Sequence, residues 1–115
     1  MILAYDTKGI DQDLNADKIF ANYTHRCLGT VRIMGGEVWA QGYCKYMAPD
    51  GGFFIVSYNG PSGAKPLPWD YIYGTGKWKG VKGRGTGKYI TNGKPIAEGT
   101  FQSCMEISGT YELPK

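Results

Sequence analysis

The sequence predicts an all-β protein, folded as a small closed antiparallel β-barrel of about eight strands. Short runs rich in Val, Ile, Thr and aromatic residues are separated by Gly, Pro, Asn and Asp, a pattern typical of strands joined by turns. The chain has 18 glycines and is 14% aromatic, whereas no long stretch carries the apolar period of an amphipathic helix. Closure into a barrel is expected because it leaves no strand edge unpaired.

The length of 115 residues suits one domain with a modest core, so residues 1–115 are expected to form a single barrel. Residues 1–18 would supply an N-terminal strand and loop, and residues 19–113 the barrel body. The apolar run 2–5 is the candidate first strand, and the polar stretch 6–18 is predicted to be a loop. Its alternating acids resemble the start of a calcium loop, but the glycine and the final Glu of that motif are missing, which argues against calcium.

Two long β-rich runs flank Gly35 and Gly36 and predict a β-hairpin with a two-residue turn. With this turn, Cys27 lies opposite Cys44 at a non-hydrogen-bonded pair, where Cα atoms are about 4.5 Å apart. That distance permits a disulfide bond, although a β-bulge in either strand would remove the pairing. The third cysteine, Cys104, would remain free.

Alternation along this hairpin assigns one face to the interior and the other to the outside. The inner face would carry Tyr23, His25, Val31 and Tyr46. The outer face mixes polar residues with five large apolar ones, Leu28, Met34, Trp39, Tyr43 and Met47. So many exposed apolar side chains indicate contact with a partner subunit.

Three further strands are expected after the hairpin, at 53–58, 69–73 and 100–113, and another within the glycine-rich stretch 74–89. Clusters of turn-forming residues separate them at 48–52, 59–68 and 91–95. Gly109 is the expected site of a bend or bulge.

The stretch 74–89 reads GTGKWKGVKGRGTGKY. A phosphate-binding P-loop is excluded because neither Gly-Lys pair is followed by Ser or Thr and no helix follows. As a strand, this stretch would place Gly83, Gly85 and Gly87 in succession on the inner face and leave a gap in the wall. Large side chains such as Trp78 or the tyrosines would fill the gap, or it would form a cavity for a small apolar ligand. The candidate ligand-lining residues are Tyr23, Val31, Trp69, Tyr71, Gly83, Gly85, Gly87 and Tyr89.

The run 74–89, followed by GTFQSCMEISGTYELP at 99–114, resembles bacterial members of the allene oxide cyclase-like barrel group, relatives in shape of dirigent proteins and calycins. Its most specific parts are the Gly-Thr-Gly-Lys-aromatic-Lys-Gly core and the terminal Gly-Thr-Tyr-Glu-Leu-Pro, and the likeness covers residues 20–113. The resemblance implies an eight-stranded antiparallel barrel, dimeric or trimeric, whose apolar cavity binds or cyclises lipophilic molecules. It assigns no catalytic position in this sequence.

The candidate catalytic side chains are His25, Tyr46, Tyr58 and Glu106. His25 is the only histidine and is expected on the inner face, either as a hydrogen-bonded core residue or as a general acid–base. Glu106 would lie outside, because the apolar face of 100–113 is the expected inner one, unless a bulge turns it inward and burial raises its pKa. A zinc site from His25 and two cysteines has suitable ligands but no spacing motif, so no metal or cofactor is predicted.

The net charge of +3 is too small to indicate a nucleic-acid-binding protein. The basic residues Lys77, Lys79, Lys82, Arg84 and Lys88 are expected to form a solvated outer face, with single-stranded nucleic acid or an anionic glycan as the alternative ligand. No run approaches the ~20 apolar residues of a membrane span, and the start of the chain lacks the features of a signal peptide. Oxidised cysteines would indicate an exported or periplasmic protein, and reduced ones a cytoplasmic protein.

These features predict a barrel that binds a small lipophilic molecule in its lumen, as a carrier or as a cyclase/isomerase that holds one conformer of its substrate. The alternative is a non-catalytic structural or interaction module, oligomeric, whose lumen is filled by its own side chains. That module would work through the outer patch around Trp39 and Tyr43.

Overall fold

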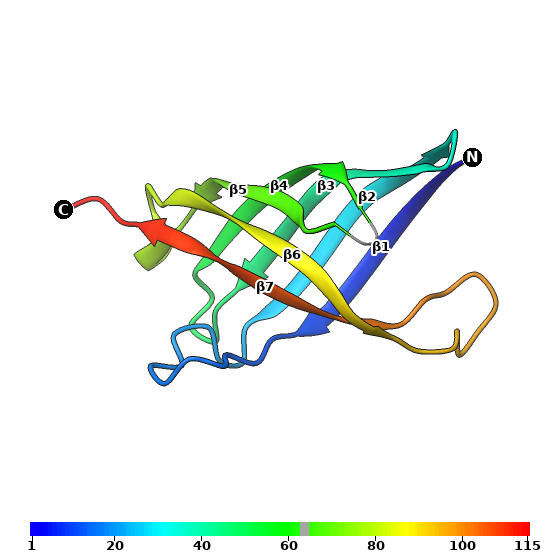
Figure 1. The fold of residues 1–115 in the computed structure, drawn as a ribbon. Coiled ribbons are helices and arrows are strands. Elements are labelled where there is room, and N and C mark those ends of the chain that lie inside the picture. Colours follow the sequence, from blue (N-terminus) through cyan, green and yellow to red (C-terminus); the bar gives the residue numbers. More distant parts are fainter. Residues whose placement is uncertain (63–64) are drawn as a thin grey trace.

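The computed structural model describes residues 1–62 and 65–115, so the centre of the predicted 59–68 loop lies outside the described residues. It is an all-β structure with 61% of residues in strands, which confirms the predicted class. The strands are β1 (Ile2–Ile10), β2 (Thr24–Met34), β3 (Glu37–Met47), β4 (Phe53–Pro61), β5 (Leu67–Gly74), β6 (Lys82–Asn92) and β7 (Ser103–Glu112). They form one antiparallel sheet in which each strand pairs with its neighbours in the sequence (Figure 1).

The sheet curls into an open half-barrel of seven strands, whose free edges β1 and β7 lie 10 Å apart. The prediction of a closed eight-stranded barrel was therefore wrong. The odd number of strands explains why the sheet stays open, because successive strands of an antiparallel meander alternate in direction. The first and seventh strands run the same way, so they cannot close the sheet with an antiparallel pair.

The hairpin of β2 and β3 has the predicted register, with Cys27 opposite Cys44 and Ile33 opposite Val38. Gly35 and its neighbour Gly36 form the turn with φ of 59° and 81°, the left-handed values that a two-residue hairpin turn requires. Cys27 and Cys44 form the expected disulfide bond, with their Cα atoms 4.1 Å apart. Cys104 is free and exposed.

β1 is longer than the sequence indicated, because residues 6–10 continue the strand instead of forming a loop. Asp6 and Lys8 point to the outer side, and the Arg26 guanidinium of β2 donates two hydrogen bonds to the Asp6 carboxylate, at 2.8 and 3.0 Å. A polar outer side is compatible with an edge strand exposed to water on that face. Strands β4 and β5 likewise extend into the predicted 59–68 loop.

The last hairpin pairs β6 with β7 in a nearly continuous register. Its irregularity lies between Tyr89 and Thr91, not at the predicted Gly109. All ten residues of β7 are exposed. The last strand thus completes the wall of the half-barrel while nothing in the described chain covers it.

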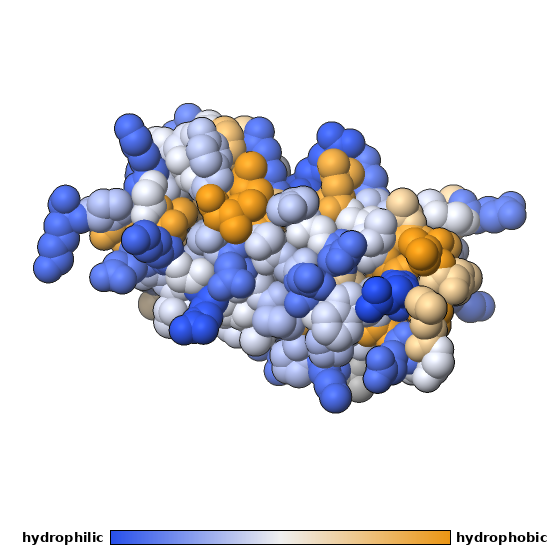
Figure 2. All heavy atoms as spheres, turned by 90° about the horizontal axis from the view of Figure 1, so that it is seen from above, coloured by the Kyte–Doolittle hydropathy of each residue, from blue (hydrophilic) through white to orange (hydrophobic). Residues whose placement is uncertain are grey.

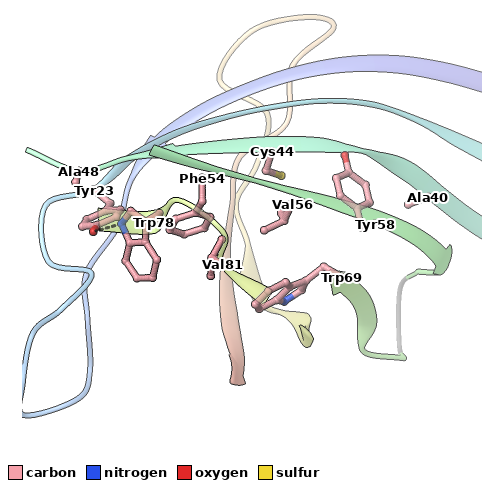
Figure 3. Packing of buried hydrophobic residues seen from close by; sticks show 10 residues of the cluster. All are labelled: Tyr23, Ala40, Cys44, Ala48, Phe54, Val56, Tyr58, Trp69, Trp78 and Val81. Carbon is pink, nitrogen blue, oxygen red and sulfur yellow. Dashed lines mark hydrogen bonds between the residues drawn. The ribbon is translucent and has the colours of Figure 1, made fainter. Parts of the chain in front are cut away.

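The core lies on the concave face of the sheet (Figure 3). Its two most buried large side chains are Trp78, from the 3-10 turn η1 (Gly76–Trp78), and Tyr23, from the segment before β2. The Trp78 indole N–H donates a hydrogen bond of 2.9 Å to the Tyr23 hydroxyl. This pair, with Phe54, fills one end of the half-barrel, while Tyr58 and Trp69 lie further along it.

Candidate functional site

Two tyrosine hydroxyls meet in the middle of the concave face, where Tyr5 of β1 and Tyr58 of β4 share a hydrogen bond. They lie over the cross-strand glycines Gly29 and Gly42, and a Cβ at Gly42 would come within 2.6 Å of the Tyr58 hydroxyl. The absence of side chains at these glycines therefore creates the space for the tyrosines. Burial is the main cause that raises the pKa of Tyr58, so its hydroxyl stays protonated at neutral pH.

His25, one of the predicted catalytic residues, lies beside the predicted Tyr46 as its cross-strand partner, with ring centroids 5.3 Å apart. Its Nδ1 forms a 2.8 Å hydrogen bond with Oδ1 of Asp11, a loop residue that sequence reasoning did not select. The second oxygen, Asp11 Oδ2, is buried without a hydrogen-bond partner in the described chain. Burial, with Asp11 as the second cause, raises the pKa of Tyr46 far above its ordinary value. A carboxylate, an imidazole and a neutral phenol thus lie together, the set that general acid–base chemistry uses.

The space around Tyr46 is filled by other aromatic rings. Phe54 stacks on Tyr46 at 5.2 Å and contacts Tyr71 at 5.0 Å, while Trp78 approaches Phe54 at 5.0 Å. Tyr71 is half-buried, and burial raises its pKa to about 12. The aromatic cluster is therefore a packed, mostly neutral layer and not an open lumen.

The three inward glycines of β6 do not leave a gap in the wall. The Trp69 ring of β5 covers Gly85, and the Met105 and Ile107 side chains of β7 lie against Gly87. Gly83 faces the β7 backbone at Tyr111, with φ of 146°. Of the two interpretations that the sequence left open, the filled gap is the one present, and its main filler is Trp69.

The other predicted lining residues are also on the concave face. Tyr23 is buried, Val31 is half-buried, and Tyr89 is exposed near the open side. Tyr58 is buried, and its hydroxyl is hydrogen-bonded to Tyr5 and not to His25.

Glu106 does not join the other predicted catalytic residues. It alternates with Met105 and Ile107, which face the concave side, so its carboxylate lies on the outer side of β7. There it is 3.8 Å from Lys88 of β6, an exposed ion pair. β7 contains no bulge that would turn Glu106 inward. The register shift of this hairpin lies in β6, between Tyr89 and Thr91.

The acidic stretch that resembles the start of a calcium loop has a structural role at Asp13. Asp13 accepts hydrogen bonds from the backbone N–H of Asn15 at 2.8 Å and of Phe20 at 2.9 Å, which fold the 11–23 loop. Among residues 1–62 and 65–115, no three His, Cys, Asp or Glu side chains are grouped so as to hold a metal ion. In the same residues no helix is long and apolar enough to cross a membrane.

Two hollows are present on the surface, and both are open to solvent. One, of about 720 Å³, lies on β1–β4, where both outer-face residues such as Leu28 and Tyr43 and the concave-face Tyr5–Tyr58 pair line it. The other, of about 680 Å³, lies at the β5–β6 connection and includes Lys79 and Lys82 of the predicted basic ridge. Neither is an enclosed apolar pocket of the kind that holds a small lipophilic ligand.

The outer face of β2–β5 exposes several large apolar side chains. Tyr43, Tyr73, Leu28 and Met47 are between 41% and 60% exposed. Seen from above, the molecule shows apolar side chains in separate groups between charged ones (Figure 2). Trp39, in contrast, is held within the chain, since its indole N–H donates to Asn59 and Arg32 stacks over its ring.

No family model, no curated protein and no solved structure matches this chain. The function is therefore argued from the chain's own residues.

Proposed function

We propose that this protein is a non-catalytic interaction module that self-associates through the outer face of β2–β5. The proposal is carried by the exposed apolar side chains on that face. Leu28 of β2 and Tyr43 of β3 are cross-strand partners. Ile55 of β4 and Tyr73 of β5 form a second apolar pair in the next row of the same face. Exposed apolar groups that gather on one face mark protein interaction sites.

The packing of side chains on the concave face also supports this proposal. Trp69, the Tyr5–Tyr58 pair and the aromatic layer around Phe54 occupy the interior. The two hollows described above reach core residues such as Tyr58 and Val81 but are open to solvent. A module of this type needs no internal cavity, whereas a carrier of lipophilic molecules does.

A second copy of the chain is the proposed partner, because most oligomers are assembled from identical subunits around a two-fold axis. Two cations, Arg26 and Lys45, lie as a cross-strand pair between the apolar rows of this face. Lys45 Nζ lies 4.2 Å from the centre of the Phe53 ring, and Arg26 is bound to Asp6, so neither cation is left without a contact. The resemblance to oligomeric barrels is in accord with this arrangement.

The test replaces both Leu28 and Tyr43 by Glu and measures the native mass over a range of concentrations. We expect the parent to be dimeric and the double variant to be monomeric, because four buried carboxylates cannot be desolvated in a symmetric contact of two copies. The matched control replaces Leu14 and Ile96, two loop residues more than 80% exposed, by Glu and should keep the parent's mass. A monomeric parent, or equal masses for all three proteins, would refute the proposal.

A second candidate function, binding or cyclisation of a small lipophilic molecule, is favoured by the Asp11–His25–Tyr46 arrangement. Hydrogen bonding to Asp11 fixes the His25 ring, a positioning that structural histidines share with catalytic ones. In this proposal His25 and Tyr46 exchange a proton with the ligand, while Tyr58 and the aromatic walls select its conformer.

Native mass spectrometry of the purified chain tests this second candidate. A mass above an integral number of chains by a few hundred daltons would reveal a bound ligand of the size such sites hold. If that ligand is turned over, His25→Gln should abolish turnover and leave binding unchanged, with Tyr73→Phe as the control at an exposed tyrosine. A ligand-free mass from freshly extracted protein would count against this candidate.

A further inference from the structure

The opening between the two free edges has the width of one missing strand. Neighbouring strands of a sheet lie about 4.7–4.9 Å apart, so two spacings add up to about 10 Å. The edges of β1 and β7 lie 10 Å apart. A single strand placed between them would be at hydrogen-bonding distance from both.

The directions of β1 and β7 also fit the addition of one strand between them. β1 and β7 are the first and seventh strands of an antiparallel meander, so the chain has the same sense along both edges. One strand running the opposite way would be antiparallel to both edges. The sheet would then close as an even-numbered antiparallel barrel, the arrangement that leaves no free edge.

Two of the features that block strand addition, proline and bulges, are missing from both β1 and β7. β1 has nine residues and β7 has ten, and each pairs on one side only within the described chain. Neither contains a proline, and both strands have continuous registers on their paired sides from 2 to 10 and from 105 to 112. Long edges without proline or bulges are templates for another strand.

The side chains that border the opening on its concave side are apolar and uncovered. Leu3 of β1 and Phe101, just before β7, are both 51% exposed, and Ile107 of β7 is 46% exposed. The Phe101 ring reaches across to Tyr5, with centroids 6.2 Å apart. The outer sides of the same edges carry charged residues, including Asp6 and Glu106. An added strand would therefore match this chemistry with apolar residues facing inward and polar residues facing outward.

We infer that the opening between β1 and β7 is a docking site for one extended peptide segment of a partner chain, with apolar residues at alternate positions. The segment lies antiparallel to both edges and completes an eight-stranded barrel. It must have both of its own edges free, which excludes a strand that is already part of a sheet. This mode is β-strand addition, in which main-chain hydrogen bonds supply affinity and inward side chains supply specificity. The inference concerns a different surface from the outer face proposed for self-association.

The experiment uses the full chain and a labelled synthetic peptide of about nine residues, the length of β1, that alternates Val and Thr between terminal lysines. Fluorescence anisotropy measures binding, and amide hydrogen exchange locates it. We expect binding together with slower exchange in both β1 and β7. The control peptide has proline in place of the central residue, which removes an N–H from the ladder, and should bind about tenfold more weakly. Equal binding of the two peptides, no binding, or protection of only one edge would overturn the inference.

Two variants of β7 make the test specific for the concave side. Ile107→Glu places a carboxylate on the inner border and should abolish binding, while Ser108→Glu adds the same charge on the outer side of the same strand and should preserve it. Both positions are exposed, so the fold should tolerate either change. The Leu28→Glu/Tyr43→Glu variant should also bind the peptide, which separates this inference from the proposed self-association. If both β7 variants bind equally, or if the chain alone protects both edges as concentration rises, the peptide site is refuted.

Discussion

The Trp69 indole lies flat against Gly85, its register partner on the neighbouring strand, and extends over Gly109 on the next. A Cβ at Gly85 would come within 2.0 Å of the Ser108 carbonyl oxygen, 2.5 Å of Trp69 Cζ2 and 2.7 Å of the Gly109 Cα. Because ring and backbone cannot both move aside, we predict that Gly85→Ala lowers the free energy of unfolding by about 1–3 kcal/mol. Urea unfolding measured by tryptophan fluorescence checks this value.

The matched control is Gly87→Ala, two residues further along the same face. Its Cβ would meet only Ile107 Cδ1 at 2.8 Å and Met105 Cε at 3.3 Å, the ends of flexible side chains. These ends can rotate away, so the control should lose much less stability. Equal losses at both positions would mean that neither the Trp69 ring nor the β7 backbone beside Gly85 determines the loss of stability.

The hairpin of β2 and β3 could be derived completely from the sequence. Its Gly-Gly turn is a local signal, and once the turn is fixed every cross-strand pair follows, including Cys27 with Cys44. The second half of β1 could not be derived, because Asp6 and Lys8 alternate with Thr7 and Gly9 and offer no apolar side. That segment is a strand because β2 supplies its partners, among them Arg26, which lies far along the chain.

The candidate site, too, could be derived from the sequence only in part. Alternation placed His25 and Tyr46 on one face correctly, but nothing local connected His25 with Asp11, which lies 14 residues earlier in a loop. The filling of the glycine gap depends on Trp69, a residue of another strand. The open edge was missed because about eight strands were predicted, whereas seven form, one too few to close an antiparallel barrel.

The disulfide should contribute strongly to stability, since Cys27 and Cys44 close a loop across 17 residues. In the chain-entropy model, constraining a loop of this length in the unfolded chain raises the free energy of unfolding by about 3 kcal/mol. We therefore predict that reduction, or the double change of both cysteines to alanine, lowers the urea midpoint markedly. Mass spectrometry of the denatured, unreduced chain should show the loss of two hydrogens.

Cys104→Ser is the control for the disulfide, because Cys104 is free and exposed. It should change neither the urea midpoint nor the mass deficit. A chain in which Cys104 participates in the bridge would instead give scrambled peptides on unreduced digestion.

The hydrogen bond between Trp78 and Tyr23 links two side chains that are each 1% exposed. Tyr23→Phe keeps the ring but leaves the indole N–H buried without its acceptor, which costs about 1–3 kcal/mol. The matched change Tyr73→Phe removes a hydroxyl from a tyrosine that is 55% exposed and should leave the unfolding free energy within error. If Tyr23→Phe is equally neutral, water or another group replaces the hydroxyl.

The Asp6–Arg26 pair should be visible in an acid titration. The Arg26 guanidinium, assisted by Lys8, lowers the pKa of Asp6 to about 2. Because the folded pKa lies below the ordinary value of 3.8, the pair stabilises the fold above about pH 4, and this contribution is lost as the pH falls toward 2. Carboxyl NMR should give a midpoint near 2 for Asp6, and Arg26→Gln should move it back toward the ordinary value. An unchanged midpoint in that variant would show that the guanidinium is not the cause.

Tyr71 should make the fold sensitive to alkali. Burial raises its pKa from 10.0 to about 12, with Tyr111 and Tyr23 as further causes. A folded pKa above the unfolded one means that the folded state keeps its proton between these values, so the contribution is complete below about pH 10 and is lost as the pH rises toward 12. We predict that urea midpoints fall over this window and that tyrosinate absorbance increases on unfolding.

Tyr71→Phe removes one ionisable group and should reduce the slope of stability against pH, while Tyr43→Phe, at an exposed position, should leave it unchanged. Equal slopes in the parent and the Tyr71 variant would show that this phenol ionises alike in the folded and unfolded states.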